Sequence, residues 1–114
     1  MNNTKILLHS FTQLPPGWSF GEGVPIATTS VVEAQRLVDA LPGVETGAFP
    51  GLDGEVRVTA YQGTLYAECT YDGNSWSVTV RQGPVCLVQD SYRPCPRSVA
   101  LYLKSVGFEF NMGV

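Results

Sequence analysis

The chain has 114 residues, of which 44% are hydrophobic and only 15% are charged, and its net charge is −3. This length suits one globular domain with its own core, and the apolar share excludes an intrinsically disordered chain. Gly and Pro are scattered throughout and exclude a coiled coil. The seven basic residues never cluster, so we expect no nucleic-acid partner.

Membrane and secretory signals are also missing from the pattern. No apolar run approaches the roughly 20 residues of a membrane span, and the first residues hold no signal-peptide core. The three cysteines, Cys69, Cys86 and Cys95, are an odd number, which favours free thiols in a reducing compartment. We therefore expect a cytoplasmic protein with no membrane partner.

Residues 1–28 are expected to form an N-terminal segment that ends in a loop rich in Trp and Gly. The apolar residues within 3–13 fit one face of a short helix, and an edge strand is the alternative. Pro15 and Pro16 end this element, because consecutive prolines cannot continue a helix. A loop with Trp18 and three glycines follows.

The strongest helix signal covers residues 29–42. Ser30 and Glu33 have the spacing of a capping box, in which a hydroxyl and a carboxylate satisfy free backbone amides at the helix start. Pro42 stops the pattern. The apolar residues between these signals recur at helical spacing and form one stripe: Ala34, Leu37, Val38 and Leu41.

Residues 55–89 change to a period of two, which is typical of strands. Four such runs are separated by short turns, one of them carrying Asp72-Gly73. This pattern predicts a four-stranded antiparallel meander with one apolar face. That face would pack on the 29–42 helix, so the expected fold is a two-layer α+β domain.

Residues 96–114 predict a second, short helix followed by an apolar tail, after a loop over residues 90–97. The whole chain, residues 1–114, is then a single domain. The tail either packs on its own domain or joins a second chain in a homodimer. Its apolar residues are Phe108, Phe110, Met112 and Val114.

The inventory of catalytic and metal-binding residues is thin. His9 is the only histidine, and no motif gives it a partner for nucleophilic catalysis. The cysteines lack the close pair of a zinc site, and the turns at Asp53 and Asp72 lack the calcium-loop pattern. Neither a dinucleotide fingerprint nor a phosphate-binding loop is present. We expect no catalytic residues, no metal and no cofactor.

Cys95 is the one residue with a physical case for reactivity. Arg93 and Arg97 flank it, and Pro94 and Pro96 restrict the local backbone. A helix that begins here would stabilise a thiolate through its dipole, although free cysteines are commonly buried and inert. A small thiol-dependent enzyme or redox sensor is therefore the alternative function.

Exposed aromatic and basic residues favour a protein-binding module. Tyr61 and Tyr66 alternate with inward residues and should lie on the outer face of the sheet, beside Arg57 and Arg81. Such pairs commonly serve only to stabilise a sheet, but Tyr and Arg are also enriched at interface hot spots. These four residues are the first candidates for partner contacts. Arg93 and Arg97, in the predicted loop, are the second.

Charge is unevenly distributed along the chain. Residues 14–56 contain six acids and one base, whereas residues 81–104 contain four bases and one acid. The distribution is either random scatter on a solvated surface or a bipolar surface that orients a protein partner.

Two sequence stretches carry a resemblance. Residues 18–25 read W-S-F-G-E-G-V-P, and residues 49–56, after the predicted helix, read F-P-G-L-D-G-E-V. In this order they resemble a family of small bacterial and prophage proteins without an assigned activity. The resemblance covers residues 14–70 and implies a fold of one helix and a sheet; the part from Val85 onward departs from it.

The chain is also similar in type to antitoxins and to phage inhibitors of host defence such as anti-CRISPR proteins, since these are small, acidic and free of cofactors. The favoured function is a non-catalytic protein-binding module. A mobile-element-encoded inhibitor, anti-CRISPR or antitoxin-like, that blocks a partner protein is the form this resemblance implies.

Overall fold

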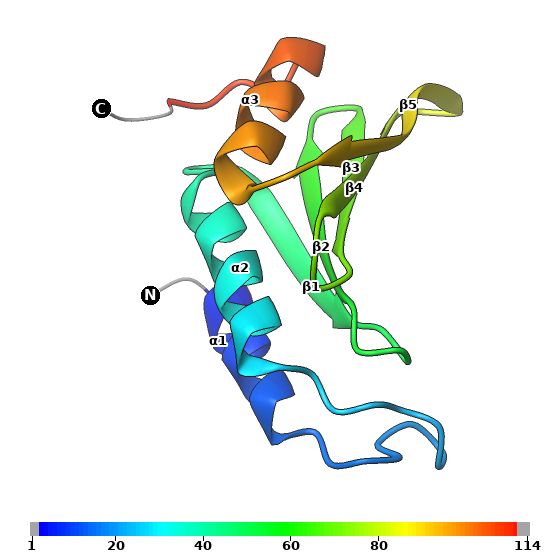
Figure 1. The fold of residues 1–114 in the computed structure, drawn as a ribbon. Coiled ribbons are helices and arrows are strands. Elements are labelled where there is room, and N and C mark those ends of the chain that lie inside the picture. The colour runs from blue at the N-terminus through cyan, green and yellow to red at the C-terminus, as the bar shows by residue number, and fades with distance from the viewer. Residues whose placement is uncertain (1–2, 112–114) are drawn as a thin grey trace.

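The computed structural model describes residues 3–111, which form a two-layer fold with helices on one face of an antiparallel sheet (Figure 1). The helices are α1 (Asn3–Ser10), extended by the short 3₁₀ turn η1 (Phe11–Gln13), α2 (Thr28–Asp39) and α3 (Pro96–Val106). The strands, in both chain and spatial order, are β1 (Glu45–Pro50), β2 (Val56–Gln62), β3 (Leu65–Tyr71), β4 (Trp76–Gln82) and β5 (Val85–Arg93).

The α+β class and the antiparallel meander are confirmed, but the described residues hold five strands instead of four, and three α-helices. The missed strand is β1, whose Gly47 and Pro50 are poor strand formers. It becomes a strand because all of its residues pair with β2, from Glu45 opposite Tyr61 to Pro50 opposite Val56. Partner strands, and not local preference, decide this element.

The core lies between α2 and the inner face of the sheet. The predicted stripe is confirmed along α2, since Ala34 and Leu37 are fully buried and Val38 nearly so. The helix ends at Asp39 and not at residue 42, and Leu41, which lies just beyond it, is also nearly buried. These side chains meet a sheet face of small and β-branched residues, which brings the helix close to the strands. That face is formed by Val56, Val58, Ala60, Ala67, Cys69, Val78 and Val80, all at 0% exposure.

The start of α2 differs from the prediction. The helix begins at Thr28, and the carbonyl of Ala27 accepts hydrogen bonds from the backbone N–H groups of Ser30 and Val31 at 3.0 and 3.2 Å. The capping box expected at Ser30 does not form, because Ser30 lies inside the first turn and is buried. Glu33 instead accepts a hydrogen bond from Arg36 at 3.1 Å.

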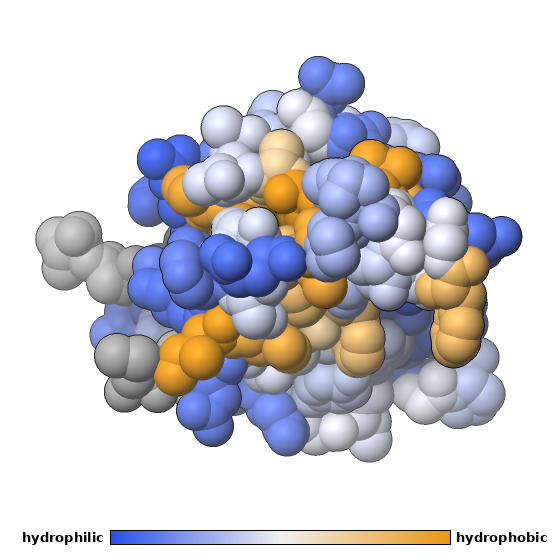
Figure 2. Space-filling view, turned by 90° about the horizontal axis from the view of Figure 1, so that it is seen from below, coloured by the Kyte–Doolittle hydropathy of each residue, from blue (hydrophilic) through white to orange (hydrophobic). Residues whose placement is uncertain are grey.

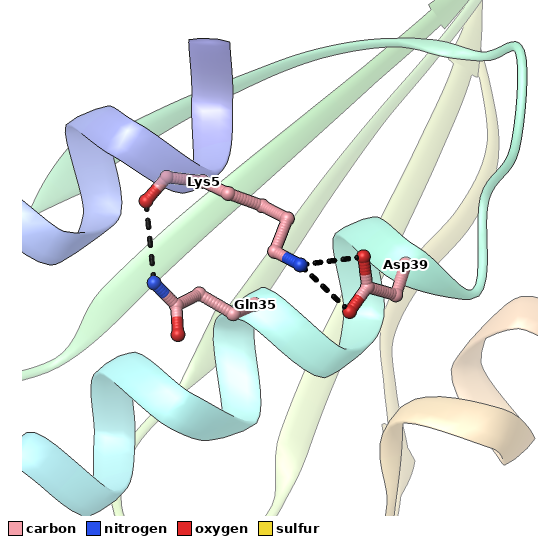
Figure 3. A network of polar contacts seen from close by, with 3 residues as sticks. All are labelled: Lys5, Gln35 and Asp39. Carbon is pink, nitrogen blue, oxygen red and sulfur yellow. Dashed lines mark hydrogen bonds and ion pairs between the residues drawn. The ribbon is translucent and has the colours of Figure 1, made fainter. Parts of the chain in front are cut away.

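The N-terminal segment is a helix, which settles the choice between helix and edge strand. Leu8 and Phe11 are buried in the core. Lys5 Nζ lies 2.9 and 3.0 Å from the carboxylate oxygens of Asp39, and Gln35 Nε2 donates to the Lys5 carbonyl at 3.2 Å (Figure 3). An exposed ion pair contributes at most about 1 kcal/mol to stability. The buried side chains of α1, and not this pair, therefore hold α1 against α2.

The C-terminal segment packs against its own domain. Phe108 is buried, and the Lys104 ammonium donates to the Phe110 carbonyl at 2.6 Å while lying 5.4 Å from the centre of its ring. Met112 and Val114 lie outside the described residues. A homodimer through the tail stays a prediction, and Phe108 is not available to such an interface.

No helix within residues 3–111 combines the length and apolarity that crossing a bilayer requires.

Truncating the α2 stripe should destabilise the fold. Leu37→Ala removes a fully buried side chain and should lower the free energy of unfolding by about 2–5 kcal/mol, measured by urea denaturation. The matched control is Leu101→Ala, because Leu101 on α3 is 48% exposed. Its effect should stay within about 0.5 kcal/mol, and equal losses for the two variants would contradict the described core.

Candidate functional site

The outer face of the sheet, opposite the helices, is covered by no other element of residues 3–111 (Figure 1). Side chains alternate along each strand, so the residues between the core positions point to this face. It carries aromatic and basic side chains in place of the small apolar ones of the core. The larger ones are Phe49, Arg57, Tyr61, Tyr66, Glu68, Arg81 and Tyr92.

Three of the predicted contact residues form one row across the outer face. Tyr61 on β2 lies opposite Tyr66 on β3, which lies opposite Arg81 on β4. The two tyrosine rings have centroids 5.0 Å apart and planes inclined by 42°. Arg57 shares the face but lies at the other end of β2, opposite Thr70. The prediction that these four residues share the outer face is confirmed.

Tyr66 is held in place by its neighbour on the same strand. Its hydroxyl donates to Glu68 Oε1 at 2.9 Å. Burial raises the pKa of Tyr66 to about 12, and the hydrogen bond and the negative charge of Glu68 act in the same direction. Tyr66 therefore keeps its proton, and the row presents an aromatic surface of fixed geometry.

Two aromatic residues of the outer face were missed from the sequence. Phe49 is 51% exposed on β1, and Tyr92 is 68% exposed on β5. The sequence predicts no strand at β1, and the fourth predicted strand ends at Gln89. No local pattern marks the first of them, because Glu45, Gly47 and Phe49 on the outer side do not differ consistently in polarity from Thr46 and Ala48 on the inner side.

Gly47 and Thr59 pack tightly against each other near the centre of the outer face. A Cβ at Gly47 would lie 2.7 Å from the Thr59 hydroxyl, so this position requires glycine. Thr59 is 1% exposed and its hydroxyl is without a hydrogen-bond partner. The face is thus packed at its centre, with its aromatic side chains towards the corners.

Arg93 does not lie in an exposed loop, which corrects the expected 90–97 loop. It ends β5 opposite Trp76, on the side of the helices, and its guanidinium carbon lies 4.0 Å from the centre of the Tyr102 ring. The strand continues past Gln89 because it remains paired with β4. Arg97 is exposed in the first turn of α3, so the two arginines predicted as one contact site lie on different elements and differ in exposure.

Cys95 caps the N-terminus of α3. The Ser98 backbone N–H donates to the Cys95 sulfur, and the Cys95 N–H donates to the Ser98 hydroxyl at 3.3 Å. The hydrogen bonds from Ser98, first the backbone and then the side chain, lower the pKa of the exposed Cys95 thiol. A helix N-terminus at this residue was expected from the sequence and is confirmed.

A surface cavity of about 420 Å³ opens where the end of α2 meets the start of α3. Ala40, Cys95 and Pro96 form its less polar part, and three charged residues surround it: Arg36, Asp39 and Arg97. We call it the α2–α3 cavity. No local pattern of residues predicts this cavity, because its two walls are more than fifty residues apart in the chain.

His9 lines a smaller hollow of about 290 Å³ with Lys5, Ile6 and Gln35. Of these neighbours, only Lys5 carries a group that can act as a nucleophile, and its ammonium is bound by Asp39. Within residues 3–111, no three His, Cys, Asp or Glu side chains gather as metal ligands would.

Comparisons of the chain with protein-family models, with curated proteins and with solved structures found no match.

The raised pKa of Tyr66 should be visible in a spectrophotometric titration. One tyrosine should ionise near pH 12, later than an unperturbed tyrosine at 10.0, and Tyr66→Phe should remove that late step. Glu68→Gln should lower its pKa by removing the negative charge. Because the folded pKa exceeds the unfolded one, this group stabilises the fold below pH 10, and the contribution is lost as the pH rises from about 10 towards 12. An unchanged titration curve for Tyr66→Phe would contradict the assignment.

Proposed function

We propose that this protein is a non-catalytic protein-binding module that contacts its partner through the outer face of the sheet. The observation that carries the proposal is the row of Tyr61, Tyr66 and Arg81 on a face that no described element covers. Tyr and Arg dominate interface hot spots because they combine large contact area with directional hydrogen bonding. Arg57 and Tyr92 extend the same surface at its other end.

Neither edge strand of the sheet is well suited to pairing with a strand from another chain, which supports recognition through the outer face. At β1, the Thr4 hydroxyl donates to the Thr46 carbonyl at 3.0 Å, so α1 packs against that strand and covers part of its edge. At β5, the register with β4 shifts twice, and Asp90 has a positive φ of 51°. Bulges and covered edges oppose the addition of a strand from another chain. The partner is therefore bound by side chains and not by strand pairing.

The row is also arranged in advance of binding. The contact between the Tyr61 and Tyr66 rings and the hydrogen bond to Glu68 restrict side chains that would otherwise lose freedom in the complex. Ordering a flexible side chain costs about 0.5–1.5 kcal/mol on association. A preformed row avoids most of that cost.

Among binding modules, an inhibitor encoded by a mobile element is the form we favour. Support comes from the resemblance of residues 18–25 and 49–56 to small prophage proteins, and from the small, acidic chain. Such a protein acts by occupying a functional surface of its partner, in the manner of an anti-CRISPR protein or an antitoxin, and works in the cytoplasm.

Removing the row should abolish partner binding without unfolding the protein. Tyr66→Ala combined with Arg81→Ala should raise the partner's dissociation constant by about thirtyfold or more, the loss typical of hot-spot residues. The measurement is quantitative affinity capture from the native host, followed by titration of the captured partner.

The matched control combines Leu7→Ala with Leu101→Ala, which removes two partly exposed side chains from the helical layer. It should bind as the unmodified protein does. If the tyrosine–arginine variant retains full affinity while circular dichroism shows both variants folded, the outer face is not the binding surface.

The second candidate function is a thiol-dependent enzyme or redox sensor, which the capped, exposed Cys95 favours. As a sensor, its thiolate would attack a hydroperoxide. The S–O bond forms as the O–O bond breaks, the sulfur is oxidised to sulfenic acid, and hydroxide or alkoxide leaves. Of the two proposals, protein binding has the larger set of supporting residues.

Cys95 should alkylate faster than Cys86, which is also exposed. Iodoacetamide labelling at neutral pH, followed by peptide mass spectrometry, gives the two rates in one sample. Buried Cys69 should react last, because burial raises its pKa to about 12. Equal rates at Cys95 and Cys86 would eliminate the thiol function.

A further inference from the structure

The loop between η1 and α2 presents one aromatic side chain to solvent. Phe20 is fully exposed, and its backbone has a positive φ of 49°, which a bulky residue rarely adopts. A conformation of this kind persists only where the surroundings enforce it, and it is most frequent at functional sites.

The surrounding loop enforces it through a set of short contacts. Trp18 Nε1 donates to the Val24 carbonyl at 2.8 Å, and the Gly17 N–H donates to the Gly23 carbonyl at 2.6 Å. The Trp18 ring lies against Gly23 so closely that a Cβ there would be 2.3 Å from it. The loop therefore packs around Trp18 and leaves the side chain of Phe20 in solvent. We call this side chain, together with the loop residues 17–24 that carry it, the Phe20 plug.

A further hydrogen bond joins this loop to the β1–β2 turn, from the Val24 N–H to the Leu52 carbonyl at 2.9 Å. Leu52 and Val24 are partly exposed beside it, and Glu22 and Asp53 are the exposed charges. Figure 2 views the molecule from this end and shows apolar side chains interspersed with hydrophilic ones. The plug is thus apolar at its tip and acidic around it.

The α2–α3 cavity has a positively charged rim, opposite in sign to the acidic residues near Phe20. Its volume of about 420 Å³ has room for a phenyl ring, since pockets that enclose small molecules start at roughly 300 Å³. Asp39 on its rim is already bound by Lys5, and Arg36 by Glu33. No described acidic side chain forms an ion pair with Arg97, so the rim has a net positive charge.

We infer that the Phe20 plug of one copy of this chain docks in the α2–α3 cavity of a second copy. The loop lies at the lower end of Figure 1, and the cavity lies at the upper end of α2, so a copy cannot fill its own cavity. An aromatic anchor in a pocket, with opposite net charges on the two surfaces around it, is the arrangement of an interface hot spot. This contact is separate from the outer face of the sheet and does not depend on the proposed function.

Sedimentation equilibrium of the purified full chain tests the inference. An interface centred on one side chain is small, so we expect reversible association with a dissociation constant of roughly 100 µM, weakened by salt. Phe20→Ala should abolish it, and Phe20→Gly should abolish it while raising the stability of the fold, because glycine adopts a positive φ without strain.

The matched control is Tyr92→Ala, which removes an exposed aromatic side chain from the outer face. It should associate as the unmodified chain does. Loss of association in Tyr92→Ala but not in Phe20→Ala would place the contact on the sheet and overturn the inference.

Exchanging the charges of the plug and of the cavity rim tests whether these two surfaces meet. Chains with Glu22→Lys and Asp53→Lys, and chains with Arg36→Glu and Arg97→Glu, should each fail to self-associate, whereas a mixture of the two should form complexes. A mixture that stays monomeric overturns the pairing of plug and cavity.

A cross-link between the loop of one copy and the cavity of another tests the contact directly. Ser19→Cys in a Cys86→Ser background should be joined by a short bismaleimide to Cys95 of another copy. Loss of the product in Cys95→Ser is expected.

A monomeric chain at millimolar concentration overturns the inference. So does a chain that stays monomeric in solution but binds phosphatidylcholine vesicles through Phe20, since the loop would then be a membrane anchor.

Discussion

The structure depends on the packing of α2 against one face of the sheet. Ala34 and Leu37 from the helix meet Val58 and Ala60 from the strands, and all four are fully buried. Burial of apolar surface of this kind is the main stabilising contribution to a domain of this size. Because α1 and α3 pack beside α2 on the same side, the whole core forms there. The opposite face is left without a cover from the described residues, and its side chains are free for another purpose.

That asymmetry gives the molecule three surfaces of different character. The outer face of the sheet carries tyrosine and arginine, the loop around Trp18 carries an isolated Phe20 with acids beside it, and the helical layer carries the α2–α3 cavity. At the edges of the sheet, α1 packs against β1 and covers part of it, and bulges distort β5. In the function we propose, contacts with a partner protein are made by side chains on a rigid frame, and association does not require the sheet to extend.

Prediction from the sequence succeeded where the pattern is local and failed where a distant partner decides. The period of two over residues 55–89 placed Tyr61 and Tyr66 on the outer face, and the spacing of Leu37 and Val38 placed them in the core. β1 escaped detection because Gly47 has no strand preference of its own and is held there by pairing with Thr59. The capping box at Ser30 was wrong because the helix begins earlier, at Thr28.

The sequence by itself determined the α+β class, the meander, the α2 stripe, the outward direction of Tyr61, Tyr66, Arg57 and Arg81, and the helix start at Cys95. These features follow from local periodicity and turn chemistry, which the order of residues contains. Only the tertiary structure decided that Arg93 packs on Tyr102, that Phe20 is left exposed by its own loop, and that Arg36 and Arg97 border one cavity. Each of these depends on segments far apart in the chain, and their distance in space is set by the packing of the core and not by any local pattern.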